Sequence, residues 1–294
     1  MKKPSWLKKK LPVSNEFYQT EHFIKENKIN TICVDAKCPN RWECFSNRTA
    51  TFLILGNTCT RNCLYCSTNH GALGEDIDNS ESKKIVDTIK KLSLDYAVIT
   101  SVTRDDLSDG GVTHFIDVIR YIKNFNNTIN IEVLTPDFNG NIESIEKIID
   151  ENIAVFSINI ETVRNLYKSI RPIGDYKRIL EIINYIKTNK PRLPIKSSLL
   201  VGLGENLEEI RETLKDLKEY GCDIILVGQY LRPTVKQVEV SKYYSLEEFN
   251  IINEIGNSLG LLTITGPFIR TSYNAKILYD NFKRRWLFNL LVIK

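Results

Sequence analysis

Short apolar segments alternate with longer amphipathic segments from residue 51 onward. Runs rich in Val, Ile, Leu and Thr predict buried strands, and they occupy residues 51–55, 96–102, 129–134, 153–160, 195–201, 223–227 and 261–265. Strands that alternate with helices imply parallel pairing through right-handed crossovers. This alternation constrains the chain to an α/β fold built on a parallel sheet.

The segments between these runs repeat apolar residues three and four positions apart, as helices packed on one face do. We expect helices over 81–93, 112–125, 141–151, 162–170, 175–189, 207–220 and 245–259. Asn206 and Glu209 can form a capping box at the start of 207–220, and Gly221 can end that helix. Because the repeat stops short of the eight units of a closed barrel, we predict an incomplete (β/α) TIM-like barrel of about six parallel strands.

Six of the seven cysteines lie between residues 33 and 66. The N-terminus is charged and lacks the apolar core of a signal peptide, and no run of about 18 apolar residues predicts a membrane span. We therefore expect a cytoplasmic protein whose clustered cysteines are metal ligands or catalysts. Cys222 stands apart and is interpreted as a small core residue. The net charge of +4 is too balanced to indicate a nucleic-acid partner.

Three cysteines with the spacing C-x3-C-x2-C, Cys59, Cys63 and Cys66, follow the first predicted strand directly. Three thiolates can hold three irons of a [4Fe-4S] cluster, which leaves the fourth iron without a protein ligand. An open metal position is where a substrate or cofactor binds. The alternative is a zinc site that His70 completes, since Cys and His both suit zinc.

A second triplet, Cys33, Cys38 and Cys44, precedes the first strand with the spacing C-x4-C-x5-C. It too can hold three irons of a cluster. The alternatives are zinc, or a redox-inert cluster that stabilises an extension with little core of its own. Pro39 lacks a backbone donor and favours an irregular ligand loop over a helix.

Polar loops follow the later strands, where ligands collect in folds of this class. They include 103–111, rich in Asp and Gly, and 202–205, whose two glycines fit a turn as well as part of a dinucleotide-binding loop. Others carry Asn159, Glu161 and Arg171. A final loop with Ser272 precedes a predicted terminal helix.

The Cys59–Cys66 spacing, with Tyr65 directly before the third cysteine, resembles the signature of the radical S-adenosylmethionine (SAM) enzymes. The resemblance implies that the open iron binds the amino and carboxylate groups of SAM. Reductive cleavage of the sulfonium then gives a 5′-deoxyadenosyl radical. By position, Tyr65, Asn159, Glu161 and Arg171 are the candidate contacts of this cofactor.

The order of the two triplets resembles the lipoyl synthase family, and the likeness runs over nearly the whole chain. It is carried by Lys3-Pro-x-Trp-Leu-Lys, Cys38-Pro-Asn-x-x-Glu-Cys44, Thr58-Cys-Thr-Arg-Asn-Cys63, Arg104-Asp-Asp-Leu-x-Asp-Gly-Gly111, Asn159-Ile-Glu-Thr-Val163, Gly228-Gln-Tyr-Leu-x-Pro233 and Arg270-x-Ser-Tyr273. The chain departs from the family at Thr271, where a serine is expected, and at Ile158, where histidine is frequent.

This resemblance implies insertion of two sulfur atoms, at carbons six and eight of an octanoyl chain on a carrier lysine. Cys33, Cys38, Cys44 and Ser272 would hold an auxiliary [4Fe-4S] cluster that donates the sulfur, with the Thr271 hydroxyl as the alternative fourth ligand. The implied partners are an octanoylated carrier domain (E2 subunits or glycine cleavage H protein), an electron donor such as flavodoxin or ferredoxin, and an iron–sulfur cluster carrier. Neither nucleic acid nor a membrane is implied.

We divide the chain into an extension over 1–50 that carries the auxiliary cluster, a partial barrel over 51–265 and a C-terminal segment over 266–294 that closes over that cluster. Another radical SAM sulfurtransferase, such as a tRNA methylthiotransferase, is the nearest alternative, although the chain leaves little room for its RNA-binding domain. Biotin synthase has related chemistry but scatters its auxiliary ligands over the barrel. A non-catalytic metal-binding interaction module is the alternative from another class.

Overall fold

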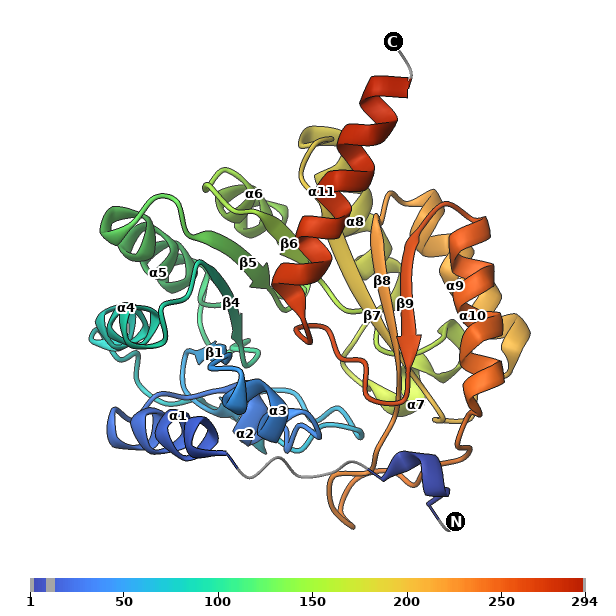
Figure 1. Cartoon of the computed structure of the whole chain (residues 1–294), viewed down its shortest axis with the longest axis horizontal. Helices are drawn as coiled ribbons and strands as arrows, with labels where there is room; N and C mark the ends of the chain where they lie inside the picture. Colours follow the sequence, from blue (N-terminus) through green and yellow to red (C-terminus); the bar gives the residue numbers. More distant parts are fainter. Residues whose placement is uncertain (1–2, 9–13, 293–294) are drawn as a thin grey trace.

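The computed structural model describes residues 3–8 and 14–292 of the 294-residue chain. Seven parallel strands form one sheet in the order β1 (Thr51–Ile54), β4 (Tyr96–Ser101), β5 (Asn130–Leu134), β6 (Val155–Ser157), β7 (Ile195–Val201), β8 (Ile224–Gln229) and β9 (Leu262–Gly266). The sheet curves without closing, so the incomplete barrel is confirmed (Figure 1). The strands number seven, one more than expected, because every predicted apolar run joins the sheet.

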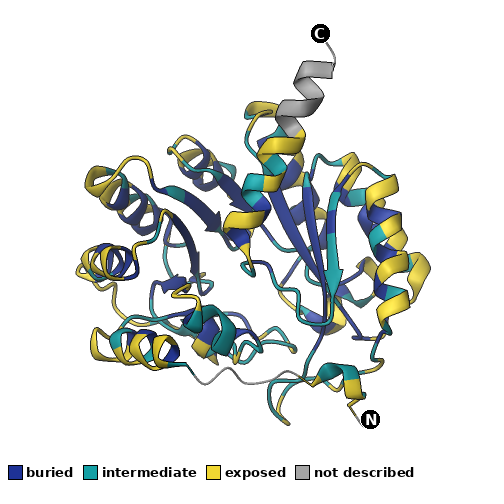
Figure 2. Cartoon of the chain, in the orientation of Figure 1, coloured by how far each residue is buried: buried dark blue, intermediate teal, exposed yellow. Residues whose placement is uncertain are grey.

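Helices cover the outer face of the sheet and bury their apolar stripes against it (Figure 2). They are α4 (Glu81–Leu92), α5 (Val112–Phe125), α6 (Ile142–Ile149), α7 (Tyr167–Ile170), α8 (Tyr176–Asn189), α9 (Leu207–Glu219) and α10 (Leu246–Ser258), with 3-10 turns η2 (Phe138–Gly140) and η3 (Arg164–Leu166). The capping box of Asn206 and Glu209 is present, and Gly221 has a φ of 101° just beyond α9. None of the helices in the described ranges combines the length and apolar character that crossing a membrane requires.

The N-terminal extension folds as η1 (Ser5–Leu7), α1 (Asn15–Glu26), α2 (Ile32–Asp35) and α3 (Arg41–Ser46). Phe17 stacks on Trp42 with ring centroids 4.4 Å apart and packs with Phe45 in a small core of its own. The expectation of an irregular cysteine loop was wrong in part: α2 carries Cys33 and α3 carries Cys44. Only the turn between these helices, with Pro39, is irregular.

The C-terminal segment runs from β9 across the carboxyl end of β8 and then forms α11 (Ala275–Val292), the predicted terminal helix. A side chain at Gly228 would collide with the Ile269 carbonyl oxygen, so this glycine allows the segment to lie against β8. The Arg270 guanidinium donates to the Gln229 carbonyl at 3.0 Å. Gly228 therefore fixes where the residues after Ile269 lie.

We predict that Gly228→Ala displaces this segment and exposes Arg270 to trypsin, because the backbone of Ile269 must move to admit a methyl group. Limited proteolysis with mass spectrometry should find cleavage after Arg270 in the variant and resistance in the native chain. Gly256→Ala in α10 is the matched control, since its methyl group would meet the Thr263 hydroxyl on β9 and not the C-terminal segment. Equal resistance of Gly228→Ala at Arg270 would contradict the prediction.

Candidate active site

One cavity of about 320 Å³ lies at the carboxyl ends of the strands, and all six clustered cysteines line it. The structure thus brings together two triplets from separate elements: Cys33, Cys38 and Cys44 of the extension, and Cys59, Cys63 and Cys66 of the loop after β1. The predicted residues Tyr65, Asn159, Glu161, Arg171 and Ser272 line the same cavity. All seven cysteines are free, and Cys222 is buried in the main core as predicted.

His70 does not line this cavity; it is exposed on β3 (Asn69–His70), which pairs with β2 (Thr58–Cys59). Within residues 3–8 and 14–292, no three His, Cys, Asp or Glu side chains lie close enough to share a single metal ion. A cluster makes a different demand on its ligands, because each thiolate binds its own iron.

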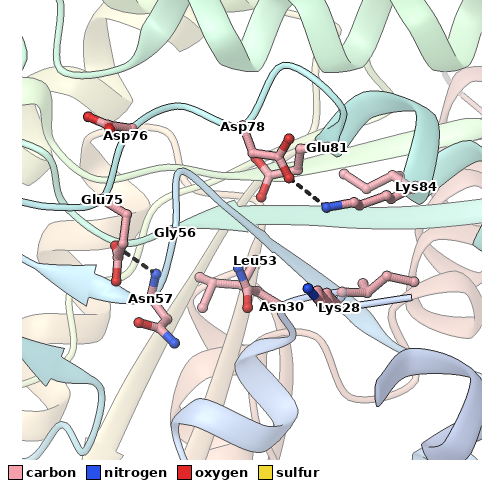
Figure 3. Close-up of a pocket in the computed structure, with 12 residues that line it drawn as sticks. Lys28, Asn30, Leu53, Gly56, Asn57, Glu75, Asp76, Asp78, Glu81 and Lys84 are labelled. Atoms are coloured by element: carbon pink, nitrogen blue, oxygen red, sulfur yellow. Dashed lines mark hydrogen bonds and ion pairs between the residues drawn. The ribbon is translucent and has the colours of Figure 1, made fainter. Parts of the chain in front are cut away.

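The turn that leads from β1 into the cysteine loop is strained and is held by carboxylates. Leu55 and Gly56 have φ values of 68° and 84°. Glu81 accepts a hydrogen bond from the Leu55 amide at 3.1 Å, while Glu75 accepts from the Asn57 and Thr58 amides at 3.1 Å and from the Thr58 hydroxyl at 2.7 Å. These acids line a smaller cavity of about 180 Å³ behind the turn (Figure 3). Their hydrogen bonds fix the direction in which the cysteine loop leaves the sheet.

Arg61, between the first two cysteines of the loop, is buried and binds three neighbours. It contacts both oxygens of Asp105 at 2.7 and 3.0 Å, Asp137 at 2.7 Å and the Asn139 side-chain oxygen at 2.8 Å. Asp105 follows β4, and Asp137 follows β5. Arg61 therefore ties the cysteine loop to the two neighbouring strand ends.

Three of the thiol groups, those of Cys33, Cys63 and Cys66, lie in surroundings that favour their neutral form. Burial raises the pKa of Cys33 to about 12 and that of Cys66 to about 11. Burial also raises the pKa of Cys63, although the neighbouring Arg171 guanidinium opposes that rise. The Arg61 amide lies 3.4 Å from Cys59 Sγ, and the Thr68 hydroxyl 3.0 Å from Cys66 Sγ. Metal binding to these sulfurs therefore releases protons.

A polar corner beside the cysteine loop joins Asn159, Glu161 and Arg171. The Asn159 amide donates to Glu161 at 2.9 Å, and Arg171 Nη1 donates to the Asn159 carbonyl at 3.3 Å and the Tyr167 hydroxyl at 2.5 Å. Loss of water raises the pKa of Glu161, although Arg171 and the Tyr65 hydroxyl pull it down. Arg171 Nε is buried without a hydrogen-bond partner among the described residues. A buried unpaired cationic donor at a cavity wall suits an anionic ligand group.

The C-terminal segment completes the cavity from the side of the extension. The Asn40 amide donates to the Phe268 carbonyl at 2.6 Å, and the Tyr273 hydroxyl donates to Glu43 at 2.6 Å. Thr271 and Ser272 both line the cavity. The Thr271 hydroxyl is engaged, because it donates to the Asn159 side chain at 3.2 Å. This contact leaves Ser272 as the better candidate for a metal ligand.

Sequence reasoning missed the roles of Arg61, Asp137 and Glu75. Arg104 is likewise buried and binds Asp106 at 2.9 Å. An arginine inside a cysteine motif and an aspartate just after a strand were the available signals. The pairing of Arg61 with Asp137 could not be predicted, because the two residues lie 76 positions apart in the sequence.

The model of the radical SAM superfamily matches residues 53–228. The chain is 42% identical to the lipoyl synthase of Caldanaerobacter subterraneus subsp. tengcongensis over 278 residues, which are 94% of this chain and 97% of that protein. It is also 42% identical to the lipoyl synthase of Caldicellulosiruptor saccharolyticus over 276 residues, covering 94% and 96% of the two chains.

Two solved structures share the fold at low sequence identity. Methylornithine synthase (PylB) superposes with a TM-score of 0.55 at 14% identity over 86% of this chain and 79% of that one. The FeFe-hydrogenase maturase HydG from Carboxydothermus hydrogenoformans gives 0.54 at 16% identity, with coverages of 90% and 70%. At such identities the likeness concerns the partial barrel alone.

We predict that Arg61→Met destabilises the fold by about 3–5 kcal/mol at pH 7, because it leaves the buried Asp137 carboxylate without its closest cation. Burial alone would raise the pKa of Asp137, but the Arg61 hydrogen bond and charge hold it below its usual value. The stabilisation is therefore present above about pH 4 and is lost as the pH falls through the lowered pKa.

Urea unfolding of the native protein and of Arg61→Met between pH 7 and pH 3 measures the prediction. The difference in unfolding free energy between the two proteins should become smaller as the pH falls. Arg120→Met, which breaks an exposed ion pair with Glu151, is the control and should cost less than about 1 kcal/mol. A difference that grows as the pH falls would contradict the assignment.

Proposed function

Because this chain belongs to the lipoyl synthase family of the radical SAM superfamily, we propose which of its residues carry out each part of sulfur insertion. The chain is a radical SAM sulfurtransferase, and its family uses a [4Fe-4S] cluster and SAM. The proposed reaction places sulfur at carbons six and eight of an octanoyl group on a carrier lysine. The observation that carries the proposal is that both cysteine triplets line one cavity.

Cys59, Cys63 and Cys66 are the proposed ligands of the cluster that binds SAM. When bound, that cluster would supply the electron that cleaves the SAM sulfonium. Arg171 would pair its buried Nε with the SAM carboxylate, and Glu161 would accept from the SAM amino group. Asn159 and Tyr65 orient Glu161, so the four residues work as one binding corner.

Cys33, Cys38, Cys44 and Ser272 are the proposed ligands of an auxiliary cluster, which serves as the sulfur-donating substrate. A serine oxygen is a harder and weaker ligand for iron than a thiolate. Such a ligand is suited to a cluster that must open as it loses sulfur. We divide the chain into an extension over 1–50, a partial barrel over 51–265 and a C-terminal segment over 266–294 that closes over the extension. The contacts of Asn40 with Phe268 and of Glu43 with Tyr273 support this closure. Residues 1–2, 9–13 and 293–294 of these segments lie outside the described residues.

The substrate class is a lipoyl carrier, and a reductant must supply electrons for a radical SAM reaction. We propose an octanoylated E2 subunit or glycine cleavage H protein as the carrier, flavodoxin or ferredoxin as the reductant, and a cluster carrier for repair. Seven free cysteines fit a reducing compartment such as the cytoplasm. The tRNA methylthiotransferase and interaction-module alternatives are not favoured by likeness to lipoyl synthases over 94% of the chain.

The direct test is a product mass. The protein is reconstituted anaerobically with iron and sulfide and given SAM, a strong reductant and an octanoyl-lysyl peptide. We predict that the native chain forms the dithiolated peptide. Formation of 5′-deoxyadenosine without sulfur in the peptide would place the substrate elsewhere, and the absence of both products in iron-loaded protein would overturn the proposal.

We predict that Ser272→Ala forms 5′-deoxyadenosine but no dithiolated peptide, because only the sulfur-donating site has lost a ligand. Thr271→Ala is the matched neighbour and should retain sulfur insertion, since its hydroxyl is engaged by Asn159. The same peptide assay measures both variants. Retained sulfur insertion in Ser272→Ala would contradict the assignment of Ser272 as a ligand. Loss of sulfur insertion in Thr271→Ala alone would assign the ligand role to Thr271.

We predict that Arg171→Met raises the Kd for SAM by about 10- to 100-fold, the usual loss for a hydrogen bond to a charged group. Calorimetric titration of the cluster-loaded protein with SAM measures this change without turnover. Arg164→Met is the control, because Arg164 is exposed and pairs with Asp216 at 2.9 Å. An unchanged Kd for Arg171→Met would remove Arg171 from the cofactor site.

A further inference from the structure

Beneath the cavity, the inner face of the sheet carries a buried ion pair between Glu132 on β5 and Lys196 on β7. The Tyr96 hydroxyl donates to Glu132 at 2.8 Å, and the Ser157 hydroxyl donates to it at 3.0 Å. Glu132, Ser157 and Lys196 are each no more than 1% exposed. None of these four side chains lines the cavity or takes part in the chemistry assigned above.

The network lies directly below the cavity wall. Residues two apart on a strand point to the same face, and Leu134 on β5 and Ser198 on β7, which line the cavity, stand two positions after Glu132 and Lys196. Two strand residues span roughly 6–7 Å, so the network is the next layer down. It is backed from below by α11, where Tyr279 packs on Tyr96 with ring centroids 5.6 Å apart.

We propose that the Lys196 side chain, held in place by Glu132, supports the floor of this cavity from the layer below and so determines the longest acyl chain that the enzyme accepts. The inference rests on the proposed octanoyl substrate. The terminal carbon of that chain is one of the two sites of sulfur insertion, so its depth in the cavity must be fixed. Beyond its amide, an alkyl chain offers no hydrogen-bonding group, so a physical end to the cavity can fix the position of its terminal carbon.

The free energies of acyl binding and of the ion pair favour a floor that does not move when a longer acyl chain binds. Each methylene group moved from water into an apolar cavity strengthens binding by about fourfold. Separating a buried charge from its only counter-ion weakens the folded state by at least about 100-fold. Two further methylenes, worth about 15-fold together, cannot displace Lys196 from Glu132. The floor therefore stops a decanoyl chain while an octanoyl chain fits above it.

The test measures calorimetric binding of hexanoyl-, octanoyl- and decanoyl-lysyl peptides to the cluster-loaded, SAM-bound protein without reductant. For the native chain, affinity should rise about 15-fold from hexanoyl to octanoyl and then fall for decanoyl. Decanoyl binding as tight as octanoyl binding would overturn the floor but leave the proposed function intact. If no acyl peptide binds, both proposals fail.

Two double variants test the residue itself. Glu132→Gln with Lys196→Ala keeps an amide oxygen that accepts from one of the Tyr96 and Ser157 hydroxyls and an amide NH2 that can donate to the other. It leaves no unpaired charge and removes the bulk that supports the floor. It should raise decanoyl binding relative to octanoyl binding by at least about tenfold. Glu132→Gln with Lys196→Met is the matched control, because it is also neutral but retains the bulk, and should keep the native preference. Equal preferences in the two variants would overturn the proposal, and the native acyl series decides it if the alanine variant does not fold.

Discussion

The parallel direction of all seven strands is the constraint on which the site depends. Parallel strands place their carboxyl ends at one edge, so loops far apart in the sequence meet there. The Cys59–Cys66 loop follows β1 and the Ser272 segment follows β9, more than 200 residues later, yet both line one cavity. The sheet is open between β1 and β9, and the cysteine-bearing extension lies beside that opening (Figure 1). Its three cysteines line the cavity.

This convergence requires strained backbone at the points where loops leave the sheet. Leu55 and Glu161 both have a φ of 68°, a conformation that costs non-glycine residues about 1–3 kcal/mol. Each is held on both sides: the Leu55 amide donates to Glu81 and its carbonyl accepts from Arg104, while the Glu161 amide and carbonyl bond to β7. The strain is local and stable because the surrounding hydrogen bonds determine the conformation.

The sequence predicted the strands and longer helices because their periodicity is strong; α5 begins and ends at its predicted residues. The short helices α2 and α3 were missed, since four and six residues give too little periodicity. Leu207, the first residue of α9, is 39% exposed, whereas Ile210, Leu214 and Leu217 of the same helix are buried. Motif spacing located both cysteine triplets, but the pairs that position them, such as Arg61 with Asp137, depend on tertiary contacts.

The two ends of the cavity would recognise their ligands by different interactions. At the upper end, SAM would offer charged groups, and buried polar atoms such as Arg171 Nε can orient it by hydrogen bonds. An acyl chain offers none, so its position must come from shape. Apolar residues of similar volume would stabilise the interior at least as well as Glu132 and Lys196, because a buried ion pair loses in desolvation most of what it gains by attraction. A charged layer at this depth is therefore better explained by its role in positioning the acyl chain above it than by a contribution to the stability of the fold.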